Sequence, residues 1–87
     1  MNTFLLNISS PDGKLFSGTA TFLSVRAVAG DMAVMAGHVP FITNVKPGTH
    51  CAIHLEDGTV KEGITEGGLL TVGKNEVTYL TAGIDWE

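Results

Sequence analysis

The three histidines, His38, His50 and His54, are the residues of this 87-residue chain whose type and spacing first suggest chemistry. His50 and His54 stand four residues apart, a spacing that on a helix would bring both imidazoles to one metal ion. On a strand the same spacing separates them by about 13 Å. The residues around them alternate as a strand requires, so we predict no metal site. A metal-dependent enzyme would need the three histidines to converge.

The segment GDMAVMAGHVP, residues 30–40, combines an acid, Asp31, with a histidine, His38. Such a segment could belong to an active site, hold a metal ion or form a surface that another protein grips. A single loop histidine between Gly37 and Val39-Pro40 more often makes a contact than ligates a metal. The segment alone leaves the three alternatives open.

Nucleophilic and phosphate-binding motifs are missing from the sequence. It has no GxSxG elbow and no GxxxxGK[ST] loop, although a triad assembled across strands stays open. The pair Gly67-Gly68 predicts a bulge or a close approach of two backbones instead. We therefore predict no catalytic residue and no cofactor, and an enzyme is the less favoured interpretation.

Glycine-rich turn signals divide the chain into short candidate strands rather than helices. In residues 50–55, Cys51, Ile53 and Leu55 share one face and the residues between them share the other. We expect strands at 3–9, 14–18, 20–28, 32–36, 41–46, 49–56, 59–65, 68–73 and 76–82. The fold class predicted is all-β, an antiparallel β-sandwich or flattened barrel of about ten short strands. The end, TAGIDWE, is too short to predict a further element, and Trp86 either packs back on the sandwich or lies near a partner.

Composition excludes several partners. Five Lys and Arg against nine Asp and Glu give a net charge of −4 without a basic stripe, which argues against nucleic acid. No window approaches the roughly 20 apolar residues that cross a bilayer, and the N-terminus has no basic leader. We expect a soluble, cytosolic protein without direct membrane insertion. The single cysteine, Cys51, permits no internal disulfide and is expected to be buried.

Several ordered motifs resemble those of one family. GDMAVMAGHVPFIT at residues 30–43, followed by VKPG at 45–48, is similar to the signature of the epsilon subunit of F-type ATP synthases. SPDGKLFSGTATFLSV resembles the opening hairpin of that family, and TEGGLLTV with NEVTYL, at 65–72 and 75–80, resembles its ending. The similarity runs from about Thr3 to Ala82. Ala33 and Ala36 depart from it, since the family usually has glycine and often proline there.

The resemblance implies that residues 1–87 form a single epsilon-type domain, a ten-stranded β-sandwich. It implies a non-catalytic rotor subunit that joins the gamma subunit to the c-ring, supports proton-driven ATP synthesis and takes no small-molecule substrate. It would lie peripherally on the cytoplasmic face of the bacterial inner membrane. The alternative is a free-standing β-sandwich module that binds another protein.

The resemblance also implies contact residues. Gly30, Asp31 and Met32 match positions that face the c-ring, and a second set matches positions near gamma: Ser10, His38, Val39, Phe41 and Thr43. The competing interpretations are that Asp31 is a solvated turn residue and that Val39 and Phe41 belong to the core. The family usually continues into a helical arm, whereas the sequence stops at Glu87, either because the chain is naturally short or because it is a fragment. We expect neither ATP binding nor strong inhibition of hydrolysis.

Overall fold

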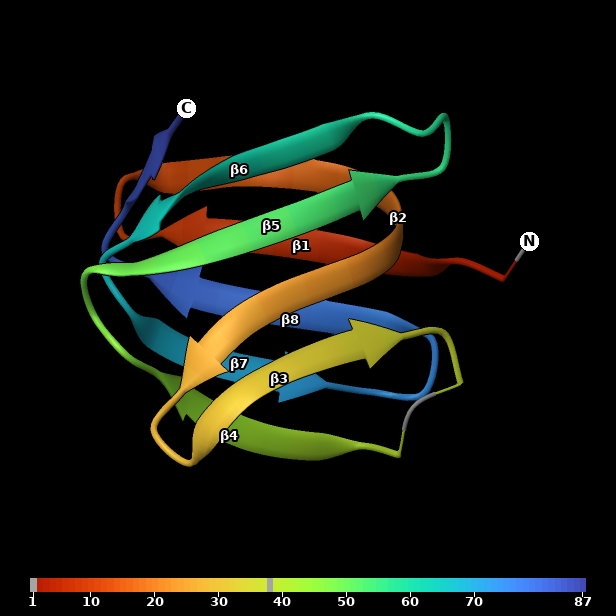
Figure 1. Cartoon of the computed structure of the whole chain (residues 1–87), viewed down its shortest axis with the longest axis horizontal. Coiled ribbons are helices and arrows are strands. Elements are labelled where there is room, and N and C mark those ends of the chain that lie inside the picture. The colour runs from red at the N-terminus through yellow and green to blue at the C-terminus, as the bar shows by residue number, and fades with distance from the viewer. Residues whose placement is uncertain (1, 38) are drawn as a thin grey trace.

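The structure is a computed structural model that describes residues 2–37 and 39–87. These residues form strands and no helix (Figure 1). The strands are β1 (Phe4–Ser10), β2 (Gly13–Ala27), β3 (Gly30–Met35), β4 (Phe41–Val45), β5 (Thr49–Leu55), β6 (Val60–Thr65), β7 (Gly68–Val72), β8 (Glu76–Thr81) and β9 (Ile84–Trp86). The predicted all-β class is confirmed. None of the described residues form a helix long and apolar enough to cross a membrane.

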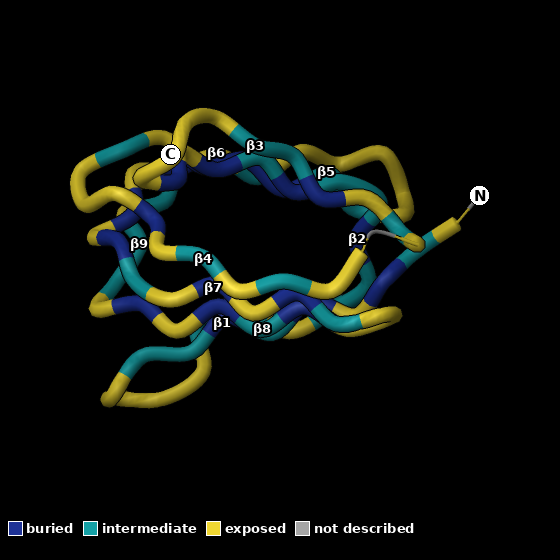
Figure 2. The backbone as a smooth tube through the Cα atoms, turned by 90° about the horizontal axis from the view of Figure 1, so that it is seen from below, coloured by how far each residue is buried: buried dark blue, intermediate teal, exposed yellow. Residues whose placement is uncertain are grey.

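The strands lie in two layers (Figure 2). One layer has the order β1-β8-β7-β4, and the other contains β2, β3, β5, β6 and β9. The long strand β2 links them, because its first half pairs with β1 and its second half with β5 and β3. The register between β2 and β5 shifts near Thr21, and a bulge of this kind bends a strand. At its end β2 also pairs with β4 through Ala27 and Val45, so the two layers close into a flattened barrel.

The space between the layers is filled by the inward side chains of alternating strands. Leu6, Leu23, Ile53 and Leu70 are fully buried, and Tyr79 is the largest buried side chain. The Tyr79 hydroxyl bonds to the hydroxyl of Thr65, which is also 3.3 Å from that of Thr81. Each buried hydroxyl of this network therefore has a partner, as low-dielectric surroundings require.

Two predicted strands, 14–18 and 20–28, are one continuous strand, β2. Gly18 ends the first of these predicted strands, but its backbone stays extended and pairs with Leu6, and the next residue, Thr19, pairs with Leu5. This fusion reduces the nine predicted strands to eight, and β9 (Ile84–Trp86) brings the described part of the chain to nine, where the resemblance implied ten. β3 begins at Gly30 rather than at residue 32, so the turn falls on Val28 and Ala29.

The expectation that residues 81–87 form no further element is wrong. Ile84–Trp86 form β9, which pairs with β6 in the register Gly63↔Trp86. Three residues suffice here because β6 already offers a formed edge. A side chain at Gly63 would place Cβ only 2.6 Å from the carbonyl oxygen of Asp85, so the glycine admits this strand. Trp86 is half-buried and packs against the core, which settles its two alternatives in favour of packing back.

Candidate functional site

The β2–β3 hairpin carries the first predicted set of contact residues. Ala27 pairs with Gly30 across the two-residue loop, and Gly30 has a positive φ of 131° that favours glycine. The hairpin is tied to the other layer by two backbone hydrogen bonds. The Val28 amide donates to the Asn44 carbonyl at 3.1 Å, and the Lys46 amide donates to the Arg26 carbonyl at 2.9 Å. The end of the hairpin is thus held in place rather than projecting freely.

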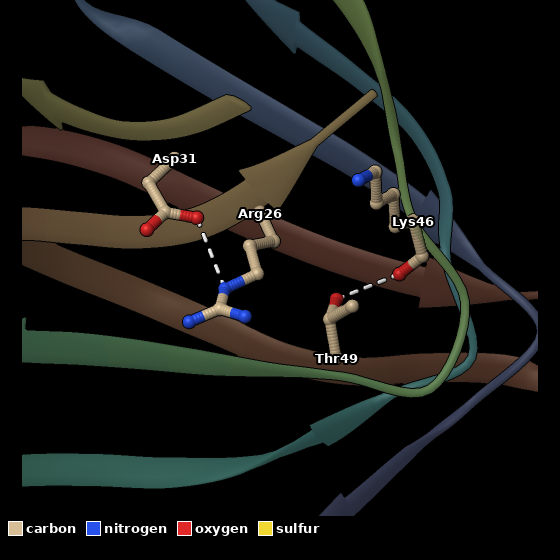
Figure 3. Close-up of polar contacts among 4 residues, drawn as sticks. All are labelled: Arg26, Asp31, Lys46 and Thr49. Atoms are coloured by element: carbon tan, nitrogen blue, oxygen red, sulfur yellow. Dashed lines mark hydrogen bonds and ion pairs between the residues drawn. The ribbon is translucent and has the colours of Figure 1, made fainter. Parts of the chain in front are cut away.

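Asp31 has an intramolecular partner that was not predicted from the sequence. Asp31 and Arg26 are direct cross-strand partners, and Arg26 Nε lies 3.0 Å from Asp31 Oδ1 (Figure 3). Both side chains are exposed, at 60% for Arg26 and 74% for Asp31. Asp31 therefore lies on strand β3 rather than in the turn, while its carboxylate stays exposed to solvent. An exposed pair of this kind contributes roughly 0.2–1 kcal/mol, so a stronger partner can replace it.

One hollow of about 320 Å³ brings residues of both predicted sets together. Gly30, Asp31 and Met32 line it from β3, and Phe41 and Thr43 line it from β4. Ala27, Ala29 and Ile42 complete the lining. The two strands belong to different layers, and among the described residues no pairing joins them, so the hollow lies between the layers beside the point where β2 pairs with β4. Its lining is mainly apolar, with Asp31 at the β3 side.

The remaining residues of the second set lie differently. Val39 is 74% exposed, so the interpretation of Val39 as a core residue is wrong. Phe41 is half-buried and packs against the core, and Thr43 is half-buried on the same strand. Their neighbour Ile42 is 67% exposed and was not predicted as a contact residue. His38 lies outside the described residues.

Ser10 lies at a second hollow, of about 600 Å³, instead of the first. Pro11, Gly67, Gly68 and Leu80 are among its lining residues. The Ser10 hydroxyl donates to the Gly13 carbonyl at 3.3 Å and accepts a hydrogen bond from the Asp12 amide at 3.2 Å. The side chain therefore shapes its own turn as well as lining the hollow.

Exposed apolar side chains continue from this second hollow across one layer. Leu69 of β7 and Leu80 of β8 are directly paired, and both are exposed, in line with Ser9 of β1. These leucines were not predicted as contact residues, although they fall on the outward phase of the predicted strands 68–73 and 76–82. The two leucines form a small exposed apolar area on this layer.

A family model described as the β-sandwich domain of the ATP synthase delta/epsilon chain matches residues 3–87. The chain belongs to this family. An ATP synthase epsilon chain from Polaromonas naphthalenivorans is 37% identical over 83 residues, which cover 93% of this chain and 58% of the relative. One from Bacillus velezensis is 36% identical over 81 residues, covering 92% of this chain and 59% of the relative.

The chain spans less than two thirds of the length of these relatives. A solved structure of the Euglena gracilis mitochondrial ATP synthase contains a chain that aligns with a TM-score of 0.90 at 20% identity. The alignment covers 99% of this chain and 54% of that chain. At this low identity the match bears on the fold alone, and it agrees with the β-sandwich of the delta/epsilon family.

Within this delta/epsilon-family domain, His50 and His54 have different partners. The His54 ring packs edge-on against Phe22 with 4.9 Å between ring centroids. His50 instead lies beside Glu62, with 3.2 Å between its Nε2 and the carboxylate. Buried Cys51 on the same strand is no candidate nucleophile, because desolvation raises the pKa of its thiol to about 11.

Proposed function

We propose that this domain is a non-catalytic part of the central stalk of an F-type ATP synthase, where it joins the gamma subunit to the c-ring. Residues 1–87 would act as one β-sandwich unit, and the complex would place it peripherally on the cytoplasmic face of a bacterial membrane. The observation that carries the proposal is the family match over residues 3–87. The epsilon chains that share over a third of its residues support the same role.

Gly30, Asp31 and Met32 are proposed to face the c-ring. The acid stands at the exposed start of β3, on a hairpin anchored to both layers. A rigid base suits a docking contact, because little conformational freedom is lost on binding. A cation of the ring would then compete with Arg26 for the Asp31 carboxylate.

The surface proposed to face the gamma subunit consists of Ser10, His38, Val39, Phe41 and Thr43. Exposed Ile42 and Leu80 extend this set on the same layer of the sandwich. An apolar centre with a polar rim is the usual composition of a stable protein interface. Torque passing between the c-ring and the gamma subunit would then act on the layer that contains β4 and β8.

The test of the ring contact is a substitution at Asp31. Asp31→Arg places two cations opposite each other on β2 and β3 and is expected to weaken attachment to c-rings at least tenfold, since like charges facing a basic partner repel. The matched control is Glu56→Arg, at the β5–β6 turn on the opposite end of the molecule (Figure 1). Attachment would be measured by surface plasmon resonance with the gamma subunit present.

Arg26→Gln tests whether Arg26 only competes with the c-ring for the Asp31 carboxylate or contacts the ring itself. Removing the internal competitor frees the Asp31 carboxylate, so attachment should strengthen by up to about fivefold, the equivalent of an exposed ion pair. Weaker binding by this variant would mean that Arg26 itself contacts the ring. Unchanged binding by Asp31→Arg would remove Asp31 from the interface.

A further inference from the structure

Three side chains that can ligate a metal converge on the outer face of the sheet formed by β5, β6 and β9. His50 comes from β5, Glu62 from β6, and Glu87 directly follows β9. His50 Nε2 lies 3.2 Å from Glu62 Oε1 and 4.0 Å from Glu87 Oε2. One donor atom from each residue falls within 4.8 Å of the others, and residues 2–37 and 39–87 contain no second group of this kind.

The backbone register explains why they meet. Cys51 pairs with Gly63 and Gly63 pairs with Trp86, and the exposed residues next to these positions, His50, Glu62 and Glu87, lie on one face of the sheet. The amide of Glu87 donates to the carbonyl of Glu62 at 2.8 Å and extends the ladder by one residue. His50 and Glu62 are diagonal neighbours across the β5–β6 pair, a separation that long side chains span. The sheet itself therefore holds the three positions side by side.

The donor set favours a particular class of ion. An imidazole nitrogen with two carboxylates is a zinc-type set, whereas Mg²⁺ and Ca²⁺ prefer oxygen ligands alone. Ligands about 2.1 Å from a tetrahedral zinc ion lie roughly 3.4 Å apart from one another. The two distances from His50 Nε2 bracket this value. Small side-chain rotations would complete a three-ligand site with one position left for water.

The charges of the three side chains also favour a bound cation. Glu62 and Glu87 bring two negative charges together on an exposed face, in a chain of net charge −4. A divalent cation neutralises both carboxylates, which a protonated His50 does only in part. Lys61 does not fill this role, because its ammonium lies 4.8 Å from the Trp86 ring and 5.5 Å from the Phe16 ring.

We propose that His50, Glu62 and Glu87 form a surface site for a zinc-type divalent cation. Such an ion would tie β9 to β6 and β5 and stabilise the end of the sheet. The inference does not rest on the proposed stalk function, and it departs from the sequence expectation of no metal site. Histidine spacing along one strand could not reveal it, since two of the three ligands come from other strands.

Calorimetric titration of the metal-stripped protein with ZnCl₂ tests the site. We expect one zinc ion per chain, a higher Tm in zinc, and no comparable heat with MgCl₂. His50→Ala and Glu62→Gln should each weaken zinc binding at least tenfold. His54→Ala is the matched control, because His54 lies on the same strand and contacts Phe22 instead. Asp85→Asn is the carboxylate control on β9.

Equal zinc affinity in His50→Ala and the unaltered protein would overturn the proposal, as would the absence of any binding heat. Loss of binding in His54→Ala to the same degree would place the ion elsewhere and would also overturn it. Circular dichroism of each variant without zinc shows whether the fold is retained. The paired use of His50→Ala and Glu62→Gln keeps the test decisive if one variant folds poorly.

Discussion

Gly68→Ala is expected to be among the most destabilising small substitutions in this domain. A Cβ at Gly68 would lie 1.9 Å from the Leu80 carbonyl oxygen and 2.9 Å from Thr81 Cα. Both are backbone atoms of the neighbouring strand β8, so no side-chain rotation relieves the overlap. The φ of 153° adds conformational strain for any residue other than glycine.

The magnitude follows from two contributions. Backbone strain costs of order 1–3 kcal/mol, and the loss of a ladder hydrogen bond as β7 moves away from β8 costs about 1 kcal/mol. We therefore expect a loss of roughly 3 kcal/mol in the free energy of unfolding. For a domain of this size that corresponds to a fall in Tm of about 12–24 °C.

Urea and thermal unfolding followed by circular dichroism measure the effect, with Gly48→Ala as the matched control. Gly48 has a φ of 70° and open space around its missing side chain, so strain alone of about 1 kcal/mol is expected there. If Gly68→Ala were no more destabilising than Gly48→Ala, the close approach of β7 and β8 backbones would be refuted.

Two further predictions concern buried groups. Tyr79→Phe removes the hydroxyl that bonds to Thr65 and should lower the free energy of unfolding by about 1–2 kcal/mol in urea titrations; an unchanged value would contradict the network. Burial raises the pKa of Cys51 from 9.0 to about 11 and also raises that of Tyr79. The folded state thus holds these protons more tightly, so stability is fully present below pH 9 and falls as the pH rises toward 11. Cys51→Ala should flatten this fall, and an equally steep fall in that variant would contradict the assignment.

The strand positions could be predicted because inward and outward residues alternate and glycines mark the turns. The alternation of Cys51 and Ile53 with their neighbours is sufficient to predict β5. Gly67-Gly68 also behaves as predicted, since a side chain at either glycine would meet the backbone of another segment. Alternation and turn glycines can each be recognised within one short segment of the sequence, without knowledge of which strands pair.

Features that depend on pairing could not be predicted in the same way. The ion pair between Arg26 and Asp31 needs the exact hairpin register, and the predicted turn falls too late in the sequence to bring the two residues together. β9 needs the edge of β6 and the missing side chain of Gly63. The hollow shared by Met32 and Phe41 needs two strands from different layers. The family resemblance predicted the contact residues, but only the fold shows that residues of β3 and β4 line the same hollow.

We propose above that this β-sandwich binds the gamma subunit and so attaches it to the c-ring. The most direct measurement mixes the purified chain with the gamma subunit of its own organism and determines the mass of the complex by light scattering. We expect a one-to-one complex, which Ile42→Lys and Leu80→Lys weaken at least tenfold while Glu56→Arg does not. A chain that stays monomeric beside a folded gamma subunit would show that it does not bind gamma.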